Sequence, residues 1–156
     1  MLQVQVLDRL LAISALLQAD QERELGRIGL TSARTHVLWV LHHDGPSTQV
    51  HLAEAVEVTP RNITSLVDAL VATGFVHRMP HPDDRRAVLV TLTERGMAVM
   101  ETMAREHGEL NTALLAGLDR ETAEAMARGL EHVSSRLTSL IDENTRARDD
   151  LPRETA

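Results

Sequence analysis

The stretch TPRNITSLVDALVATGFVHRMPHPDDRRAVLVTLTERG, which runs from Thr59 to Gly96, decides the fold of this chain. Its first part has the pattern of an amphipathic helix. Thr59 is a suitable helix N-cap, and Pro60 stands at the first helical position, where its fixed φ is favourable. Apolar residues then recur at helical spacing, and Gly74 is a suitable C′ residue to end the helix. The apolar face consists of Ile63, Leu66, Val67 and Leu70, so that Arg61, Asn62, Ser65 and Asp68 face outward.

The second part of the stretch changes to the pattern of extended chain. Residues 75–78 and 87–92 are two short apolar runs that predict strands, and a charged tip with two prolines separates them. A short helix with a polar outward face, followed directly by a hairpin with a basic tip, is typical of a winged helix-turn-helix.

Two helices are predicted at the start of the chain. Residues 2–26 alternate apolar and polar positions in a helical rhythm, which Gly26 and Gly29 interrupt. Thr31 then caps a second helix that ends at the strong turn signal of residues 44–46. Its inward face is predicted to be Val37, Leu38, Val40 and Leu41, with Trp39 alongside.

A third, short helix is predicted from Gln49 to Val56, with Ser47 or Thr48 as its cap. Its predicted inward residues are Val50, Leu52, Ala53 and Val56. Glu57 and Val58 make a tight turn into the helix that begins after Thr59. Two short helices joined in this way, the second with polar outward residues, are the helix-turn-helix arrangement.

The C-terminal third of the chain predicts two long helices. Thr93 caps the first, which ends near Gly117, and Asp119 caps the second. The second helix has an apolar seam with a regular rhythm of three and four: Ala123, Met126, Leu130, Val133, Leu137 and Leu140. Terminal helices that cannot bury such faces on a small winged domain need another surface, and a second copy of the chain supplies it.

The predicted fold is therefore mainly α with a small β-hairpin wing, a winged helix-turn-helix with N- and C-terminal dimerisation helices. The segments are residues 1–28 for the N-terminal dimerisation helix, 29–96 for the DNA-binding domain, 97–145 for the C-terminal dimerisation helices and 146–156 for a disordered tail. The tail is rich in Arg, Asp and Glu and contains Pro152.

Composition limits the function classes. The chain has 156 residues with 43% hydrophobic and 1% aromatic residues and no cysteine, which excludes disulfides, thiol redox sensing and thiolate metal sites. We find no signal peptide and no long apolar run, so a cytoplasmic protein with no membrane partner is expected. The net charge is −7, but residues 59–95 hold five arginines against four acidic residues and are slightly positive. A nucleic-acid partner remains compatible with that distribution.

Several motifs resemble those of the MarR (multiple antibiotic resistance regulator) family of bacterial transcription factors. They are LTSARTHVLWVL, the run from DGPSTQVHLAEAVEV into TPRNITSLVDAL, GFVHR, and HPDDRRAVLVTLTERG, and together they cover about residues 28–98. The resemblance implies a homodimer that represses transcription from a pseudo-palindromic operator and is released by a small ligand or an oxidant. Release by thiol oxidation is excluded here, because the chain has no cysteine.

The resemblance also assigns roles in the wing. Arg86 is implied to enter the minor groove, Asp84 to orient it through a bidentate pair, and Arg85 to face a phosphate. Some members of the family carry an arginine where this chain has Ser65, so that the base preference of the family does not transfer.

Candidate DNA contacts follow from residue type and position. Arg61 and Asn62 have the geometry to recognise the edges of guanine and adenine. Small polar residues at helix starts suit phosphates, although simple capping explains them equally well. The full candidate set is Thr48, Gln49, Thr59, Arg61, Asn62, Thr64, Ser65, His81, Asp84, Arg85 and Arg86.

Other functions are weighed against DNA binding. The eight histidines lack a metal-ligand spacing, so no metal or cofactor is expected, and a metal-responsive regulator of the same fold is kept as an alternative. A second alternative is a helical protein-interaction module that binds no DNA. Ser47, His51 and Glu54 share a short segment, but nothing marks Ser47 as an activated nucleophile, and the chain is predicted not to be an enzyme.

The resemblance further implies an effector cleft between the dimerisation helices and the winged domain. Arg9, His36, Trp39 and Met97 lie on elements that would line it. In the alternative interpretation, Trp39 and Met97 belong to the core and Arg9 to a surface ion pair. Neither the effector nor the operator sequence follows from these residues.

Overall fold

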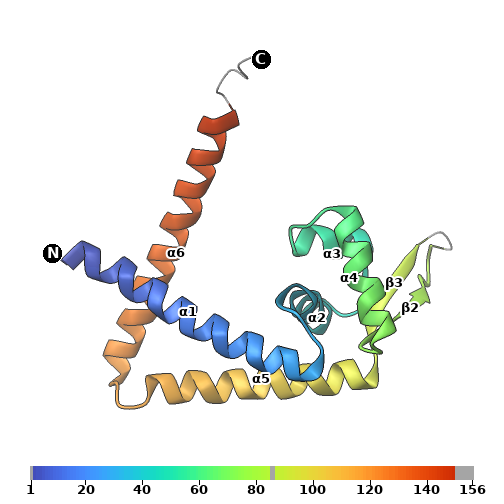
Figure 1. Ribbon diagram of the computed structural model, residues 1–156, viewed down its shortest axis with the longest axis horizontal. Coiled ribbons are helices and arrows are strands. Elements are labelled where there is room, and N and C mark those ends of the chain that lie inside the picture. Colours follow the sequence, from blue (N-terminus) through green and yellow to red (C-terminus); the bar gives the residue numbers. More distant parts are fainter. Residues whose placement is uncertain (1, 85–86, 150–156) are drawn as a thin grey trace. The chain divides into compact units, whose positions relative to one another are not determined.

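The computed structural model describes residues 2–84 and 87–149, which form six helices and a small sheet (Figure 1). The elements are α1 (Leu2–Ile28), α2 (Ser32–Asp44), β1 (Ser47–Thr48), α3 (Gln49–Ala55), α4 (Pro60–Ala72), β2 (Val76–Pro80), β3 (Val88–Leu92), α5 (Glu94–Leu115) and α6 (Arg120–Asp149). The chain divides into two compact units, residues 1–106 and 107–156. None of the helices in the described ranges is long and apolar enough to cross a membrane.

Helix starts follow the predicted caps. The hydroxyls of Thr31, Thr48 and Thr59 each accept a hydrogen bond from a backbone N–H three residues further on, at 3.2–3.4 Å. Thr48 is therefore the cap of α3, while the hydroxyl of Ser47 is buried and donates to the carbonyl of Gly45 at 2.9 Å. These caps satisfy amides that a helix start otherwise leaves without a partner.

The last helix also begins where a cap was predicted. The Asp119 carboxylate accepts from the Thr122 amide at 2.7 Å. Hydrogen bonds from the backbone and then the side chain of Thr122 hold the pKa of Asp119 below its usual range. No proline or glycine follows Gly129 before Pro152, and α6 continues to Asp149, past residue 146 where the tail was expected to begin. The disorder of the tail stays a prediction. Residues 150–156 lie outside the described part of the chain.

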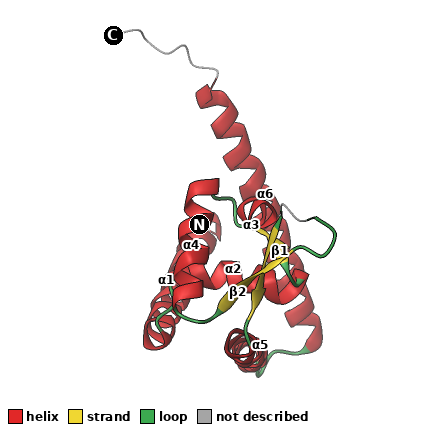
Figure 2. Cartoon of the chain, turned by 90° about the vertical axis from the view of Figure 1, so that its right-hand side faces the viewer, coloured by secondary structure: helices red, strands yellow, loops and turns green. Residues whose placement is uncertain are grey.

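The sheet has three strands in the order β1-β3-β2, all antiparallel (Figure 2). The hairpin of β2 and β3 was predicted, with Val76 opposite Leu92 and Pro80 opposite Val88. Strand β1 was not predicted, because a pair of residues is too short to show an alternating pattern. Its Ser47 lies opposite Val90, which ties the turn before α3 to the hairpin.

One hydrophobic core holds the first unit together. It takes residues from α1 to α5 and from β2 and β3, and partly buried residues such as Trp39 and Val99 pack around it. Its largest fully buried side chains include Phe75, Leu38, Leu52, Ile63, Leu70 and Met100. Each such side chain contributes about 1.5–3 kcal/mol through burial. The predicted inward faces of α2 and α4 are thus confirmed at their central positions.

Val50 corrects the prediction for α3. It was expected to face inward, but 69% of its surface is exposed. Leu52 is fully buried, and a residue two positions earlier lies about 200° away around the helix. Helix α3 is only seven residues long, so its inward face has room for Leu52 and Ala53 but not for Val50.

The start of α5 lies against the chain that follows α4. A Cβ atom at Gly96 would come within 2.1 Å of the carbonyl oxygen of Phe75 and 3.3 Å of Leu92 Cδ2. The same Phe75 oxygen accepts from the Thr93 amide at 3.0 Å. Only glycine at position 96 allows this approach, because Phe75 is itself fixed in the core.

We predict that Gly96→Ala destabilises the protein by about 3 kcal/mol, because either α5 or the Phe75 segment must shift. Gly108→Ala is the matched control in the same helix, since a Cβ there meets nothing within 4 Å. That variant should be stabilised by about 0.5–1 kcal/mol. Thermal unfolding of both variants at equal chain concentration measures the difference, and equal melting temperatures would contradict the close approach.

Candidate nucleic-acid interface

The first two turns of α4 present polar side chains to solvent. Arg61, Asn62, Thr64 and Ser65 are all exposed, whereas Ile63 of the same turns is buried. Ile63, Val67 and Leu70 anchor the helix to the core along one face. The buried face attaches the helix to the core, while the polar residues of its first two turns stay accessible to solvent. The sequence predicted both faces correctly.

Helices α3 and α4 are linked at this polar surface. Thr64 Oγ1 lies 3.1 Å from Gln49 Oε1 and 2.9 Å from the carbonyl oxygen of Pro60, and its hydrogen serves one acceptor at a time. A glutamine that accepts through Oε1 keeps both N–H groups for other acceptors, such as phosphate oxygens. Thr48, Gln49, Thr59 and Thr64 thus lie at the starts of two joined helices, where backbone amides also favour anions.

The turn between the two helices is tight. Glu57 has a φ of 54°, in the left-handed region, and the Val58 amide donates to the Ala53 carbonyl at 3.0 Å. This reversal brings the C-terminus of α3 next to the start of α4, as expected for a helix-turn-helix.

An ion pair that the sequence did not predict connects α4 to the hairpin. Arg78 Nη2 on β2 donates to Asp68 Oδ1 on α4 at 2.6 Å, with 33% and 59% of the two side chains exposed. Asp68 lies on the outward face of α4, where an unpaired carboxylate would repel phosphates. Arg78 offsets that charge and fixes the hairpin against the helix. Both residues looked like ordinary surface charges in the sequence, because ten positions separate them.

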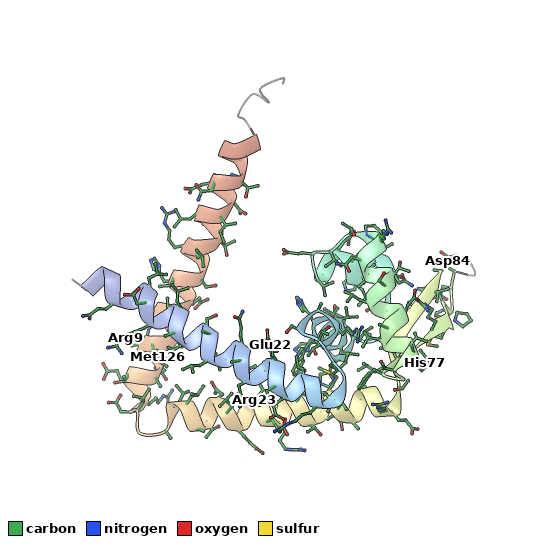
Figure 3. The ribbon with its side chains drawn as sticks, viewed as in Figure 1. Arg9, Glu22, Arg23, His77, Asp84 and Met126 are labelled. Atoms are coloured by element: carbon green, nitrogen blue, oxygen red, sulfur yellow. The ribbon has the colours of Figure 1, made fainter. Side chains whose placement is uncertain are left out.

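The wing is the hairpin of β2 and β3 with the loop between them. His81 Nδ1 accepts from the amides of Asp83 and Asp84, both at 3.2 Å, so the His81 ring closes the loop instead of pointing freely at a ligand. Asp84 is exposed and lies at the outer end of the wing, far from His77 near the start of β2 (Figure 3). Arg85 and Arg86, the predicted wing contacts, lie outside the described residues.

The predicted effector residues are not assembled in one place within the chain. Arg9 is exposed in the half of α1 away from α2, about 24 Å along the helix from the buried Leu25 (Figure 3). His36 and Met97 are exposed, and Trp39 is partly buried against the core. Arg9 therefore shares no pocket with Trp39 of its own chain, and the effector cleft stays a prediction.

A cavity among the described residues lies elsewhere, between α3 and the start of α4. Its volume is about 410 Å³, and its lining includes Gln49, Val50, Val58, Pro60 and Thr64. The exposed Val50 lines this cavity together with two of the candidate DNA contacts, Gln49 and Thr64.

Ser47, His51 and Glu54 do not form a catalytic group. The Ser47 hydroxyl is turned to the Gly45 carbonyl, and His51 Nε2 lies 2.8 Å from Asp44 Oδ2. No group of three or more potential metal ligands occurs within residues 2–84 and 87–149.

Comparison with known proteins places these features in a family. A sequence profile described as the MarR family matches residues 30–88. The HTH-type transcriptional repressor IacR of Pseudomonas putida is 31% identical over 121 residues, which cover 78% of this chain and 72% of IacR. The HTH-type transcriptional repressor NicR of Pseudomonas putida is 38% identical over 94 residues, which cover 58% of this chain and only 60% of NicR.

A solved structure with a similar fold is the complex of S. aureus MepR with DNA. The TM-score is 0.66 at 25% identity, and the match covers 85% of this chain and 98% of MepR. The predicted fold, mainly helical with a winged helix-turn-helix, is confirmed by this similarity and by the described elements.

The cap of α4 allows a local test. Thr59→Ala should lower the free energy of unfolding by about 1 kcal/mol, because the Asn62 amide loses the acceptor that lies 3.2 Å away. Thr59→Ser keeps the hydroxyl and should retain most of that stability. Urea unfolding of the three proteins measures the loss, and an unchanged midpoint for Thr59→Ala would mean that the cap does not stabilise α4.

Proposed function

Because this chain belongs to the MarR family, we propose that it is a homodimeric transcriptional repressor that binds a pseudo-palindromic DNA operator in the cytoplasm and is released by a small-molecule effector. Family members are DNA-binding regulators, and the similar proteins include two named repressors and a regulator solved with DNA. This chain is accordingly not an enzyme.

A single observation carries the proposal: the polar row at the start of α4 stands exposed on a helix whose opposite face is fully buried. Arg61, Asn62 and Ser65 are free of the core, and the helix below them is fixed by Ile63 and Val67. A helix presented in this way fits the major groove, with its N-terminal residues at the base edges. The capped starts of α3 and α4 then face the phosphates.

The proposed dimer rests on apolar surface at both ends of the chain. On α1, Leu7, Leu11 and Leu16 are 61–72% exposed. On α6, the predicted seam is exposed as well, with Leu130 at 47% and Leu137 at 56%. Large exposed apolar patches mark interaction surfaces, and a second copy of the chain would both cover these leucines and supply the second recognition helix for a two-half-site operator.

The proposed effector is a small molecule that acts without thiol chemistry, since the chain has no cysteine. His36, Trp39 and Met97 stay the proposed lining on α2 and α5. Arg9 reaches a shared cleft only from another copy of the chain, because of its distance along α1 from the core.

The DNA contacts are tested by Arg61→Ala and Asn62→Ala. If these side chains recognise base edges, each variant should bind the operator about 1–3 kcal/mol more weakly and lose preference at one or two positions of each half-site. Selection of bound fragments from a random library, followed by titration at several salt concentrations, measures both effects.

Arg120→Ala removes the same charge from an arginine that is 92% exposed on α6 and serves as the control with unchanged binding. Uniform weakening on all sequences would place Arg61 or Asn62 on phosphates. Wild-type binding that does not depend on salt would contradict the DNA-binding function itself.

The dimer is tested by the double substitution Leu130→Lys with Leu137→Lys. Light scattering should report a shift from dimer toward monomer, because two charges would enter the apolar contact. Glu131→Lys alters the net charge by the same amount on an exposed, polar position of α6 and should stay dimeric. A stable dimer of the double variant would exclude the α6 seam from the interface.

A further inference from the structure

Three consecutive carbonyl groups follow the C-terminal end of α4, and the start of α5 binds all three. Arg95 Nη1 donates to Thr73 O at 2.7 Å, Thr93 Oγ1 donates to Gly74 O at 2.7 Å, and the Thr93 amide donates to Phe75 O at 3.0 Å. Thr73 is the C-cap of α4 and the next two residues lie beyond the helix, so their carbonyls have no partner within α4 and these donors satisfy them. Figure 1 shows that the end of α4 meets the start of α5 at this point.

We call these contacts, between residues 73–75 after α4 and Thr93 and Arg95 at the start of α5, the α4–α5 joint. Arg95 contributes two interactions to this joint. Its guanidinium carbon lies 4.5 Å from the centroid of the Phe75 ring, while Nη1 reaches the Thr73 carbonyl. A planar guanidinium can stack on a ring and donate in its own plane, which an ammonium group cannot do. Phe75 is only 1% exposed, so Arg95 stacks on a ring that is packed into the core.

The remaining contacts make the joint stiff. Thr93 Oγ1 also accepts from the Gly96 amide at 3.0 Å, so the residue that caps α5 is the one that holds the end of α4. Gly96 lies so close to the Phe75 carbonyl that α5 cannot slide across it. Helices α4 and α5 are therefore coupled in their orientation.

We propose that Arg95 is a positioning residue for DNA binding, which acts by locking the end of the recognition helix α4 to the start of α5. The inference rests on the proposed function. Asn62 lies about 16 Å along α4 from Thr73, so a tilt of about 5° at the joint moves Asn62 by about 1.4 Å. Hydrogen bonds to base edges require donor–acceptor distances within a few tenths of an ångström, and such a tilt breaks them.

The test compares Arg95→Ala and Arg95→Lys with wild type and with Arg120→Ala, the charge-matched control. Circular dichroism first establishes a temperature at which each protein is folded. Operator titrations at that temperature and at several salt concentrations should then give an affinity about tenfold weaker for Arg95→Ala, with part of the loss restored by lysine. The slope of log K against log salt should equal that of wild type, because no phosphate contact is removed.

Hydrogen exchange provides a readout without DNA. The amides of Phe75 and Thr93 should exchange faster in Arg95→Ala, while that of Leu38 in the core of α2 keeps its wild-type rate. If Arg95→Ala does not fold, Arg95→Lys carries the same comparison, because it keeps the charge and loses the stacked geometry.

Three results would overturn the proposal. A salt slope that is shallower by about one makes Arg95 a phosphate ligand. A lower melting temperature with unchanged affinity assigns it to stability alone. If the Phe75 and Thr93 amides exchange in Arg95→Ala as fast as in wild type, a loosened contact between α4 and α5 is not the cause of weaker operator binding. If wild-type protein shows no salt-dependent DNA binding, the proposed function is refuted instead. The exchange rates of Phe75 and Thr93 then still test whether Arg95 holds α4 to α5.

Discussion

The packing of Gly96 against the carbonyl group of Phe75 is the constraint on which the winged unit depends. Phe75 lies between the end of α4 and the start of β2, and it is buried among core residues from most elements of the first unit. A Cβ atom at position 96 would lie 2.1 Å from the carbonyl oxygen of Phe75, so the first turn of α5 can pack here only with glycine at that position. The hairpin returns the chain to this point, so the wing, α4 and α5 share one junction.

Charge is used sparingly on the proposed DNA-binding surface. The chain is acidic overall, and the segment that carries α4 and the wing is close to neutral. Pairing of Asp68 with Arg78 keeps one carboxylate from opposing phosphates. In the proposed function, neutral N–H groups at the capped starts of α3 and α4 would bind phosphates without adding net charge. Such a surface depends on correct positioning more than on a broad cationic field.

The helices at the two ends of the chain expose apolar side chains, in contrast to the buried hydrophobic core. Helices α1 and α6 are long, and both leave large apolar side chains exposed. Among the described residues, the apolar core around Phe75 and Leu38 takes from α1 only its C-terminal Leu25, and α6 has no buried residue. Exposed apolar rows of this kind are the basis for the proposed dimer, in which a second copy of the chain would cover them.

The sequence by itself determined the helices, their caps, the hairpin and the two faces of α4, because periodicity and capping depend on residues a few positions apart. Thr59, Pro60, Ile63 and Gly74 were sufficient for the recognition helix. The tertiary structure alone decided the pairing of Ser47 with Val90, the exposure of Val50, the Asp68–Arg78 pair and the attachment of Thr93 and Arg95 to the end of α4. Apart from Val50, where the short α3 sets the burial, these contacts join residues ten or more positions apart. A local sequence pattern cannot predict contacts between residues so far apart in the chain, because those contacts depend on how the whole core packs.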